Sequence, residues 1–130
     1  MSTTQTATNI VDVGTIGVPV TDQDRALAFY RDALGFEVGI DAAFGEGQRW
    51  LEVAPPGATT SVALVRDEGI PPGIDTGIRF TTTDAVADHA ALRERGVDVD
   101  PEIIPFPVPM FTLRDPDGNR LYVVERPAGG

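Results

Sequence analysis

The chain has 130 residues, of which 42% are hydrophobic, enough for one well-buried core but too few for a second independent domain. It contains no cysteine, so disulfides, thiolate metal sites and a cysteine nucleophile are excluded. Its formal net charge of -10 disfavours nucleic acid and anionic membranes as partners, because both are bound mainly through Lys and Arg. No apolar run approaches the ~20 residues that span a bilayer, and the N-terminus does not look like a secretion signal, so we expect a cytoplasmic protein.

The first half of the chain begins with a strand that leads into a helix. Residues 1–9 are small and polar and are expected to be flexible. Residues 11–20 are rich in β-branched side chains, which predicts a strand, and Thr21-Asp22 after them can cap a helix. Apolar residues at helical spacing then predict a helix over 24–34, with Gly35 placed to end it.

Three shorter extended segments complete this half, at 36–40, 48–54 and 60–66. Turns rich in glycine and proline separate them. The first half therefore has the predicted order βαβββ.

The second half repeats this order after the linker 67–73. Residues 74–82 predict a strand, Asp84 begins a helix and Gly96 ends it. The apolar residues expected on the buried side of this helix are Val86, Ala90 and Leu92. The stretch 101–109 contains four prolines, which cannot donate sheet hydrogen bonds, so we expect a sheet edge or a loop there.

A hairpin closes the second half. Residues 110–114 and 121–125 predict strands joined by Asp115-Pro116-Asp117-Gly118-Asn119, in which Gly118 takes the left-handed position of the turn. This geometry predicts that Leu113 pairs with Leu121 and that Thr112 pairs with Tyr122.

Several stretches in this order carry a family resemblance. They are Val18-Pro19-Val20-Thr21-Asp22, 25–30, Leu34-Gly35-Phe36, 92–97 and 111–124. The chain resembles the vicinal oxygen chelate superfamily, the group of glyoxalase I, bleomycin-resistance proteins and extradiol dioxygenases. The resemblance implies an α+β fold in which two βαβββ modules form a curved mixed sheet around a cavity. We expect one glyoxalase-like domain over 10–127, with module 1 at about 10–66 and module 2 at about 74–127.

The resemblance also implies where a metal would bind. Metal-dependent members carry one ligand on the first and one on the last strand of each module, and the matching positions here hold Thr15, Ala63, Gly77 and Tyr122. A catalytic divalent ion needs at least three nitrogen or carboxylate donors, and Ala and Gly offer none. We therefore expect no metal and no other cofactor, which disfavours metal-dependent glyoxalase or dioxygenase activity. His89, the only histidine, is interpreted as a partly exposed structural residue of the second helix.

Strand side chains alternate between two faces, so the residues that face the cavity can be assigned. The predicted lining is Thr15, Gly17, Trp50, Glu52, Ser61, Ala63, Gly77, Arg79, Met110, Thr112 and Tyr122. Such a mixture of apolar walls and few polar groups is typical of a site for an organic ligand. Glu52 and Arg79 would need partners in an enclosed volume, so either they pair with each other or Arg79 takes an anionic oxygen of the ligand.

Two functions fit this site, and both stay open on the sequence. The first is metal-free binding of a small aromatic or cationic molecule, as the resemblance to bleomycin-resistance proteins implies. The residues expected to bind it are Thr15, Trp50, Ser61, Phe106, Met110 and Thr112, with Phe106 reaching the cavity mouth from the proline-rich loop. The second is a metal-independent isomerase, lyase or cyclase acting on a carbonyl compound. Its general base would be Glu52, with Arg79 stabilising an oxyanion and Tyr122 as the acid.

A third, plainer hypothesis is a regulatory or assembly module whose cavity has no ligand. The resemblance further implies a homodimer, because half-barrels of this kind leave sheet edges without a partner. The expected partners are thus a small organic ligand and a second copy of the chain.

Overall fold

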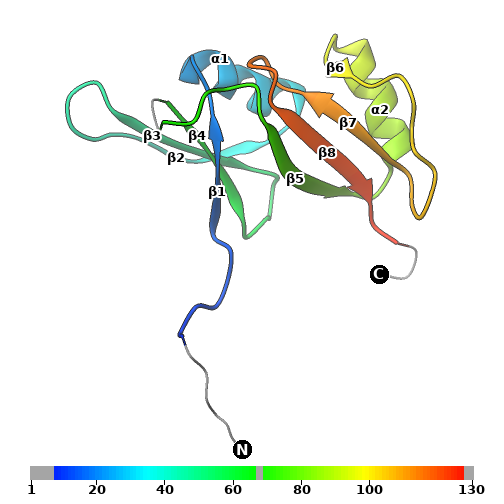
Figure 1. Cartoon of the computed structure of the whole chain (residues 1–130), viewed down its shortest axis with the longest axis horizontal. Helices are drawn as coiled ribbons and strands as arrows, with labels where there is room; N and C mark the ends of the chain where they lie inside the picture. The colour runs from blue at the N-terminus through cyan, green and yellow to red at the C-terminus, as the bar shows by residue number, and fades with distance from the viewer. Residues whose placement is uncertain (1–7, 67–68, 128–130) are drawn as a thin grey trace, which may run out of the picture.

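Each half of the chain builds one four-stranded sheet, as the computed structural model of residues 8–66 and 69–127 shows (Figure 1). The strands of module 1 are β1 (Thr15–Pro19), β2 (Glu37–Ala43), β3 (Arg49–Ala54) and β4 (Ser61–Val65), in the sheet order β1-β4-β3-β2. The strands of module 2 are β5 (Asp75–Thr82), β6 (Asp98–Val99), β7 (Met110–Arg114) and β8 (Arg120–Glu125), in the order β5-β8-β7-β6. The predicted α+β class with two βαβββ modules is confirmed, and its strands are divided between two sheets.

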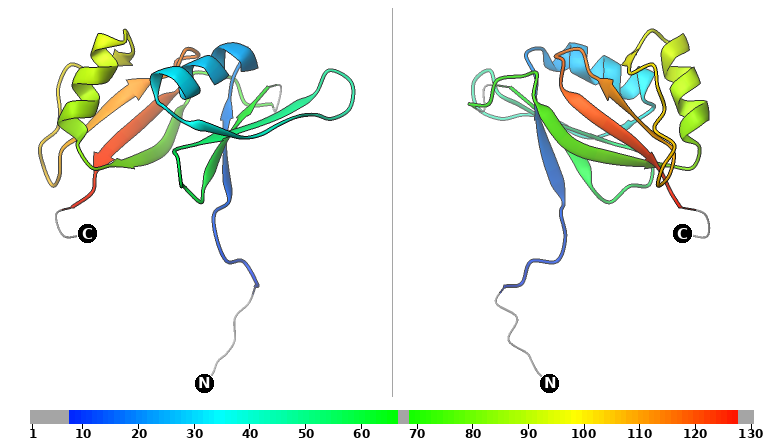
Figure 2. Two further views of the ribbon diagram at one scale, coloured as in Figure 1. Left: turned by 180° about the vertical axis from the view of Figure 1, so that it is seen from behind. Right: turned by 45° about the vertical axis from the view of Figure 1, so that its right-hand side comes forward.

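The helices lie on the same side of the two sheets and leave the opposite faces without a helix (Figures 1 and 2). In module 1, α1 (Gln23–Ala28) begins after Asp22, whose carboxylate accepts a hydrogen bond from the Arg25 amide, and it continues into the π-helical turn η1 (Phe29–Ala33). In module 2, α2 (Ala85–Glu94) is capped in the same way by Asp84. We call the helix-free faces the open faces of the two sheets.

The buried core is continuous between the modules. Leu51 and Val53 of β3 and Leu113 of β7 are fully buried in it, and the Phe36 ring packs edge-on against Phe80 at 5.1 Å between centroids. Burial alternates along the strands as predicted, so the side chains between these core residues point to the open faces. No helix in the described part of the chain is long and apolar enough to cross a membrane.

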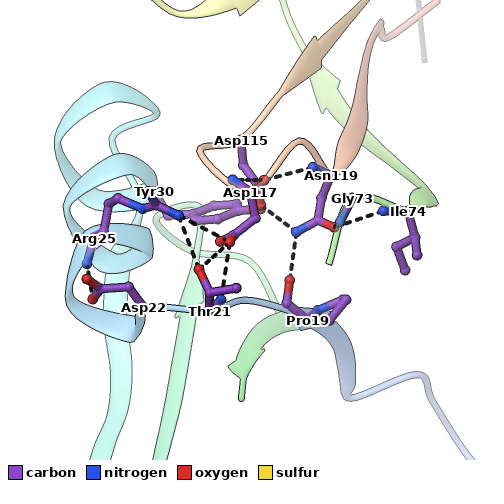
Figure 3. A network of polar contacts seen from close by, with 10 residues as sticks. All are labelled: Pro19, Thr21, Asp22, Arg25, Tyr30, Gly73, Ile74, Asp115, Asp117 and Asn119. Atoms are coloured by element: carbon purple, nitrogen blue, oxygen red, sulfur yellow. Dashed lines mark hydrogen bonds and ion pairs between the residues drawn. The ribbon is translucent and has the colours of Figure 1, made fainter. Parts of the chain in front are cut away.

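The hairpin between β7 and β8 is joined to module 1 by a network of polar contacts, which we call the clasp (Figure 3). Asn119 is fully buried; its side-chain amide donates to the Pro19 carbonyl at 2.8 Å, and its side-chain oxygen accepts from the amides of Gly73 and Ile74. Buried Tyr30 of η1 donates to Asp115 at 2.9 Å. One amide side chain therefore joins the end of β1, the entry to β5 and the hairpin.

Asp117 adds a second set of contacts to this clasp. Its Oδ1 atom accepts from the Thr21 hydroxyl at 2.6 Å and pairs with Arg25 at 3.2 Å. Burial, together with the nearby Asp115 carboxylate, raises the pKa of Tyr30 well above its usual value, so this phenol stays a hydrogen-bond donor. The predicted register of the hairpin strands is confirmed, with Leu113 opposite Leu121 and Thr112 opposite Tyr122.

Three elements differ in detail from the sequence predictions. The first strand begins only at Thr15, and the preceding Val11 and Val13 are 95% and 61% exposed. The predicted helix over 24–34 changes to π-helical geometry after Ala28, with the Leu34 amide bonded to the Phe29 carbonyl five residues earlier. The repeated βαβββ order requires a strand after the second helix; it is the short β6, whose position the sequence did not indicate. Of the segments expected to be flexible or to form the linker, residues 1–7 and 67–68 lie outside the described residues.

The buried side of α2 also differs from the prediction. It is formed by Ala85, His89 and Leu92, whereas Val86 is 57% exposed and Ala90 also lies on the exposed side. Ala85, His89 and Leu92 are spaced by four and three residues, so they lie on one face of the helix and the His89 ring points inward with them. This ring packs edge-on against Phe111 at 5.1 Å, and its Nε2 lies 2.7 Å from the Asp100 carbonyl. His89 is structural, as predicted, but it is buried and not partly exposed.

Candidate functional site

The strand registers show which positions on the open faces of the two modules are equivalent. In module 1, Ala63 of β4 lies opposite Gly17 on one side and Glu52 on the other. In module 2, Tyr122 of β8 lies between Arg79 and Thr112 in the same way. The equivalent positions are therefore Gly17 with Arg79, Glu52 with Thr112, Ala63 with Tyr122 and, two residues before the first pair, Thr15 with Gly77.

On the open face of module 1, four polar side chains form a chain of hydrogen bonds. The Trp50 indole N–H donates to Glu52 Oε2 at 2.6 Å, and the Ser61 hydroxyl donates to Glu52 Oε1 at 2.6 Å. The hydroxyls of Ser61 and Thr15 are 3.2 Å apart. The Ser61 and Trp50 hydrogen bonds hold the pKa of the Glu52 carboxyl below its usual value, so this carboxylate is ionised at neutral pH.

On the open face of module 2, a different cluster surrounds Tyr122. Its hydroxyl donates to Asp75 Oδ2 at 2.7 Å, and the Arg79 guanidinium lies over its ring at 4.6 Å from the centroid. Arg79 also donates to the Gly77 carbonyl at 2.8 Å, while the Gly77 amide donates to Asp75. The hydrogen bond from Tyr122 is the main reason that the pKa of Asp75 is lowered.

Glu52 and Arg79 therefore have separate partners. Glu52 is bonded within module 1 and Arg79 within module 2, so the pairing considered from the sequence does not occur in the single chain. A carboxylate acts as a general base near neutral pH when its pKa is raised, but the pKa of Glu52 is lowered.

The other predicted lining residues are placed less uniformly. Met110 and Thr112 are half-buried on the module 2 face, whereas Ala63 is only 1% exposed. Phe106 is 81% exposed in the proline-rich loop, which also contains a bridge from Ile104 to Met110. The expected role of Phe106 at a cavity mouth has no contact to support it in the single chain.

A cavity of about 240 Å³ lies elsewhere, between the modules on the helix-covered side. Its walls include Leu34 and Phe36 from module 1 and Phe80 and Leu92 from module 2. Neither Glu52 nor Arg79 lines this cavity. The candidate site residues on the open faces are therefore not enclosed in the single chain, and they lie outside this cavity.

Sequence reasoning missed two residues of the open faces. Asp75, the partner of Tyr122, lies two and four residues before Gly77 and Arg79 and inside the predicted strand 74–82, so the same alternation already indicated its face. Ile40 pairs with Glu52 across β2 and β3 and is 44% exposed. A register irregularity between Val38 and Ile40 breaks the alternation of β2, so sequence alone gives little indication of the face of Ile40.

The four positions implied as metal ligands do not form a donor set. The Thr15 hydroxyl is engaged with Ser61, the Tyr122 hydroxyl donates to Asp75, and Ala63 and Gly77 have no donor atoms. Across residues 8–66 and 69–127, no three His, Cys, Asp or Glu side chains gather in a group able to hold a metal ion. The residues present at these positions therefore do not fit the metal that the fold family implies.

Two modules of this order, with the Asp-Pro hairpin between the last two strands, define a glyoxalase-type protein. The sequence model of the Glyoxalase/Bleomycin resistance protein/Dioxygenase superfamily matches residues 12–123, and the chain belongs to this superfamily.

Three relatives are similar to this chain over most of its length. A superfamily member of known structure from Sphaerobacter thermophilus DSM 20745 is 38% identical, with a TM-score of 0.82 over 90% of this chain and 98% of that one. TnmS3, an antibiotic binding protein from Streptomyces sp. CB03234, is 40% identical, with a TM-score of 0.81 over 92% of this chain and 99% of that one. The uncharacterized protein YetH of Bacillus subtilis (strain 168) is 30% identical over 120 residues, which cover 89% of this chain and 99% of YetH.

Proposed function

We propose that this protein binds a small organic ligand on the open faces of its sheets without a catalytic metal, and that it acts by sequestering the ligand. The observation that carries the proposal is the hydrogen-bonded cluster of Thr15, Ser61, Glu52 and Trp50. It presents an indole and a fixed carboxylate where a metal-dependent relative would hold its ion. Similarity to TnmS3, which is described as an antibiotic binding protein, supports the same function class.

The site proposed here is completed by a second copy of the chain. In the single chain both open faces are exposed. Two apolar side chains of module 1 are also exposed: Ile40 of β2 by 44% and Val13, just before β1, by 61%. A homodimer that brings the face of one module against the other module of its partner would enclose the ligand and bury this apolar surface. Light scattering should give twice the chain mass of 13.8 kDa, and a monomer at micromolar concentration would contradict this part of the proposal.

The main test is a ligand screen by thermal shift, with planar aromatic compounds and bleomycin as probes. It is run at cytoplasmic pH, because we expect the protein to work in the cytoplasm. Binding to the native state alone raises the unfolding temperature with ligand excess. The shift should survive treatment with a metal chelator and should be reduced in a Trp50→Ala variant. A protein purified with one divalent ion per chain, or a shift abolished by the chelator, would contradict metal-free binding.

The alternative is a metal-independent isomerase, lyase or cyclase acting on a carbonyl compound. One observation favours it: the bond to Gly77 uses one of the five N–H donors of Arg79, which leaves others to hold an oxyanion beside Tyr122. The lowered pKa of Glu52 makes it a weak base, so this function ranks second. If the protein catalyses deuterium incorporation into carbonyl compounds in D₂O and Glu52→Gln abolishes it, the enzymatic function would rank above ligand sequestration.

A further inference from the structure

We propose that Glu52, together with the Trp50 ring, is the anchor for a cationic nitrogen of an aromatic ligand. This inference rests on the proposed ligand-binding function and names the chemical class of the ligand. It replaces the role of general base, which the sequence suggested for Glu52, by the role of a fixed counter-charge.

The carboxylate of Glu52 is oriented but not neutralised. Each of its oxygens accepts one short hydrogen bond from an uncharged donor, at 2.6 Å from Trp50 and at 2.6 Å from Ser61. An ionised carboxylate offers about four lone-pair positions, so each oxygen can accept a further bond. The cluster therefore fixes the direction in which a ligand donor would approach.

Within residues 8–66 and 69–127, no cation forms an ion pair with Glu52, whose partners are the uncharged donors of Trp50 and Ser61. The ion pairs of Arg25, Arg31, Arg49 and Arg114 are all with aspartates. Arg79, a cation of the other open face, lies over Tyr122 with Asp75 nearby. Glu52 is thus a half-buried negative charge that a ligand cation can match.

The aromatic partner makes the site more selective than a lone carboxylate. The indole of Trp50 is half-buried and is held by its own N–H bond to Glu52. An indole face is the best side-chain surface for a cation, and a planar ligand can stack on it while its nitrogen reaches the carboxylate. In module 2 the equivalent of Glu52 is Thr112, so this anchor exists once per chain.

The test compares two planar tricyclic probes of nearly equal size, cationic 9-aminoacridine and neutral acridone, by fluorescence titration at pH 7. The full chain should bind 9-aminoacridine more tightly than acridone. In Glu52→Gln the affinity for 9-aminoacridine should fall at least about tenfold, the size of a lost charge-assisted hydrogen bond, while that for acridone stays within about twofold. Retained acridone binding also shows that the variant is folded.

Glu94→Gln is the matched control, because it removes the same charge from an exposed position of α2, a helix of module 2 on the side away from the open faces (Figure 1). It should change the affinity for both probes by less than about twofold, and the preference for the cation should persist in 0.5 M salt, where the Debye length is below about 5 Å. Equal loss in both variants would assign the preference to the net charge of -10 and overturn the role of Glu52.

The outcomes separate this inference from the function on which it rests. If both probes bind equally and Glu52→Gln changes neither, the ligand-binding function stands and the cationic anchor is wrong. If neither probe nor any compound of the screen binds the full chain, the proposed function fails and the anchor fails with it.

Discussion

The two modules share one backbone plan and differ in what they place on their open faces. In module 1 the positions around Ala63 hold a glycine, a glutamate and a tryptophan; in module 2 the same positions around Tyr122 hold Arg79, Thr112 and Met110. Module 1 thus carries an indole and an unpaired carboxylate, and module 2 a guanidinium stacked on a phenol. The comparison shows that equivalent core positions are apolar in both modules, whereas equivalent open-face positions carry different chemistry.

The largest expected effect tests whether the two modules unfold together. Leu51 and Phe111 occupy equivalent core positions and are at most 1% exposed. Because the core is continuous, Leu51→Ala and Phe111→Ala should each lower the free energy of unfolding by about 3–5 kcal/mol. Urea denaturation followed by fluorescence of the single tryptophan, in module 1, should shift equally for both variants. A Phe111→Ala variant with an unchanged Trp50 transition would show that the modules unfold separately.

The next effect concerns the clasp between the modules. Asn119→Ala leaves the Pro19 carbonyl and the amides of Gly73 and Ile74 without their buried partner, so the free energy of unfolding should fall by about 2–4 kcal/mol. The transitions seen by Trp50 fluorescence and by circular dichroism should also separate. Arg31→Ala, which removes only an exposed ion pair with Asp32, serves as the control and should leave the unfolding transition nearly unchanged.

A smaller effect is a pH-dependent change in stability, expected for the open face of module 1 and not for that of module 2. The pKa of Glu52 is lower in the folded chain than in the unfolded chain, so its ionised form adds stability above the ordinary pKa of a glutamate. This contribution is lost as the pH falls through the lowered folded-state value. Glu52→Gln should therefore be less stable than the parent chain by about 1 kcal/mol at pH 7, with a difference that shrinks towards pH 3. Thr112→Val, at the equivalent position of module 2, should show a difference that does not depend on pH.

The smallest effect tests the module 2 cluster alone. Removing the Tyr122 hydroxyl in Tyr122→Phe should raise the pKa of Asp75 towards its ordinary value, because that hydrogen bond is the main cause of its lowering. Carboxyl carbon NMR titration measures this directly. The titration of Glu52 should stay unchanged, since its partners lie on the other sheet; an Asp75 titration identical to that of the parent chain would show that the hydrogen bond is not formed.

Much of the fold follows from local patterns. The hairpin register was predictable because Gly118 adopts a left-handed conformation, with φ at 82°, that few other residues tolerate, and this fixes which residues pair. The alternation of β3 and β7 likewise gave the correct core residues. The first strand was predicted too long because β-branched residues such as Val11 and Val13 favour extended backbone whether or not a neighbouring strand exists.

The helices show where local patterns are insufficient. Apolar composition indicated Val86 and Ala90 as buried, but the face of α2 that packs on the core carries His89 instead. The same limit applies to Glu52 and Arg79. Alternation placed both on open faces, yet only the division into two separate sheets decides that they lie apart and bond to different partners.

The sequence by itself determined the superfamily fold, the faces of the main strands and the absence of donor atoms at Ala63 and Gly77, because turn chemistry, side-chain period and residue type are local properties. The tertiary structure decided the state of the polar groups. A carboxylate becomes a base or an anchor according to the donors around it, and for Glu52 those donors come from its own strand β3 and from the neighbouring strand β4. The role of Glu52 could therefore be proposed only once β3 and β4 were paired.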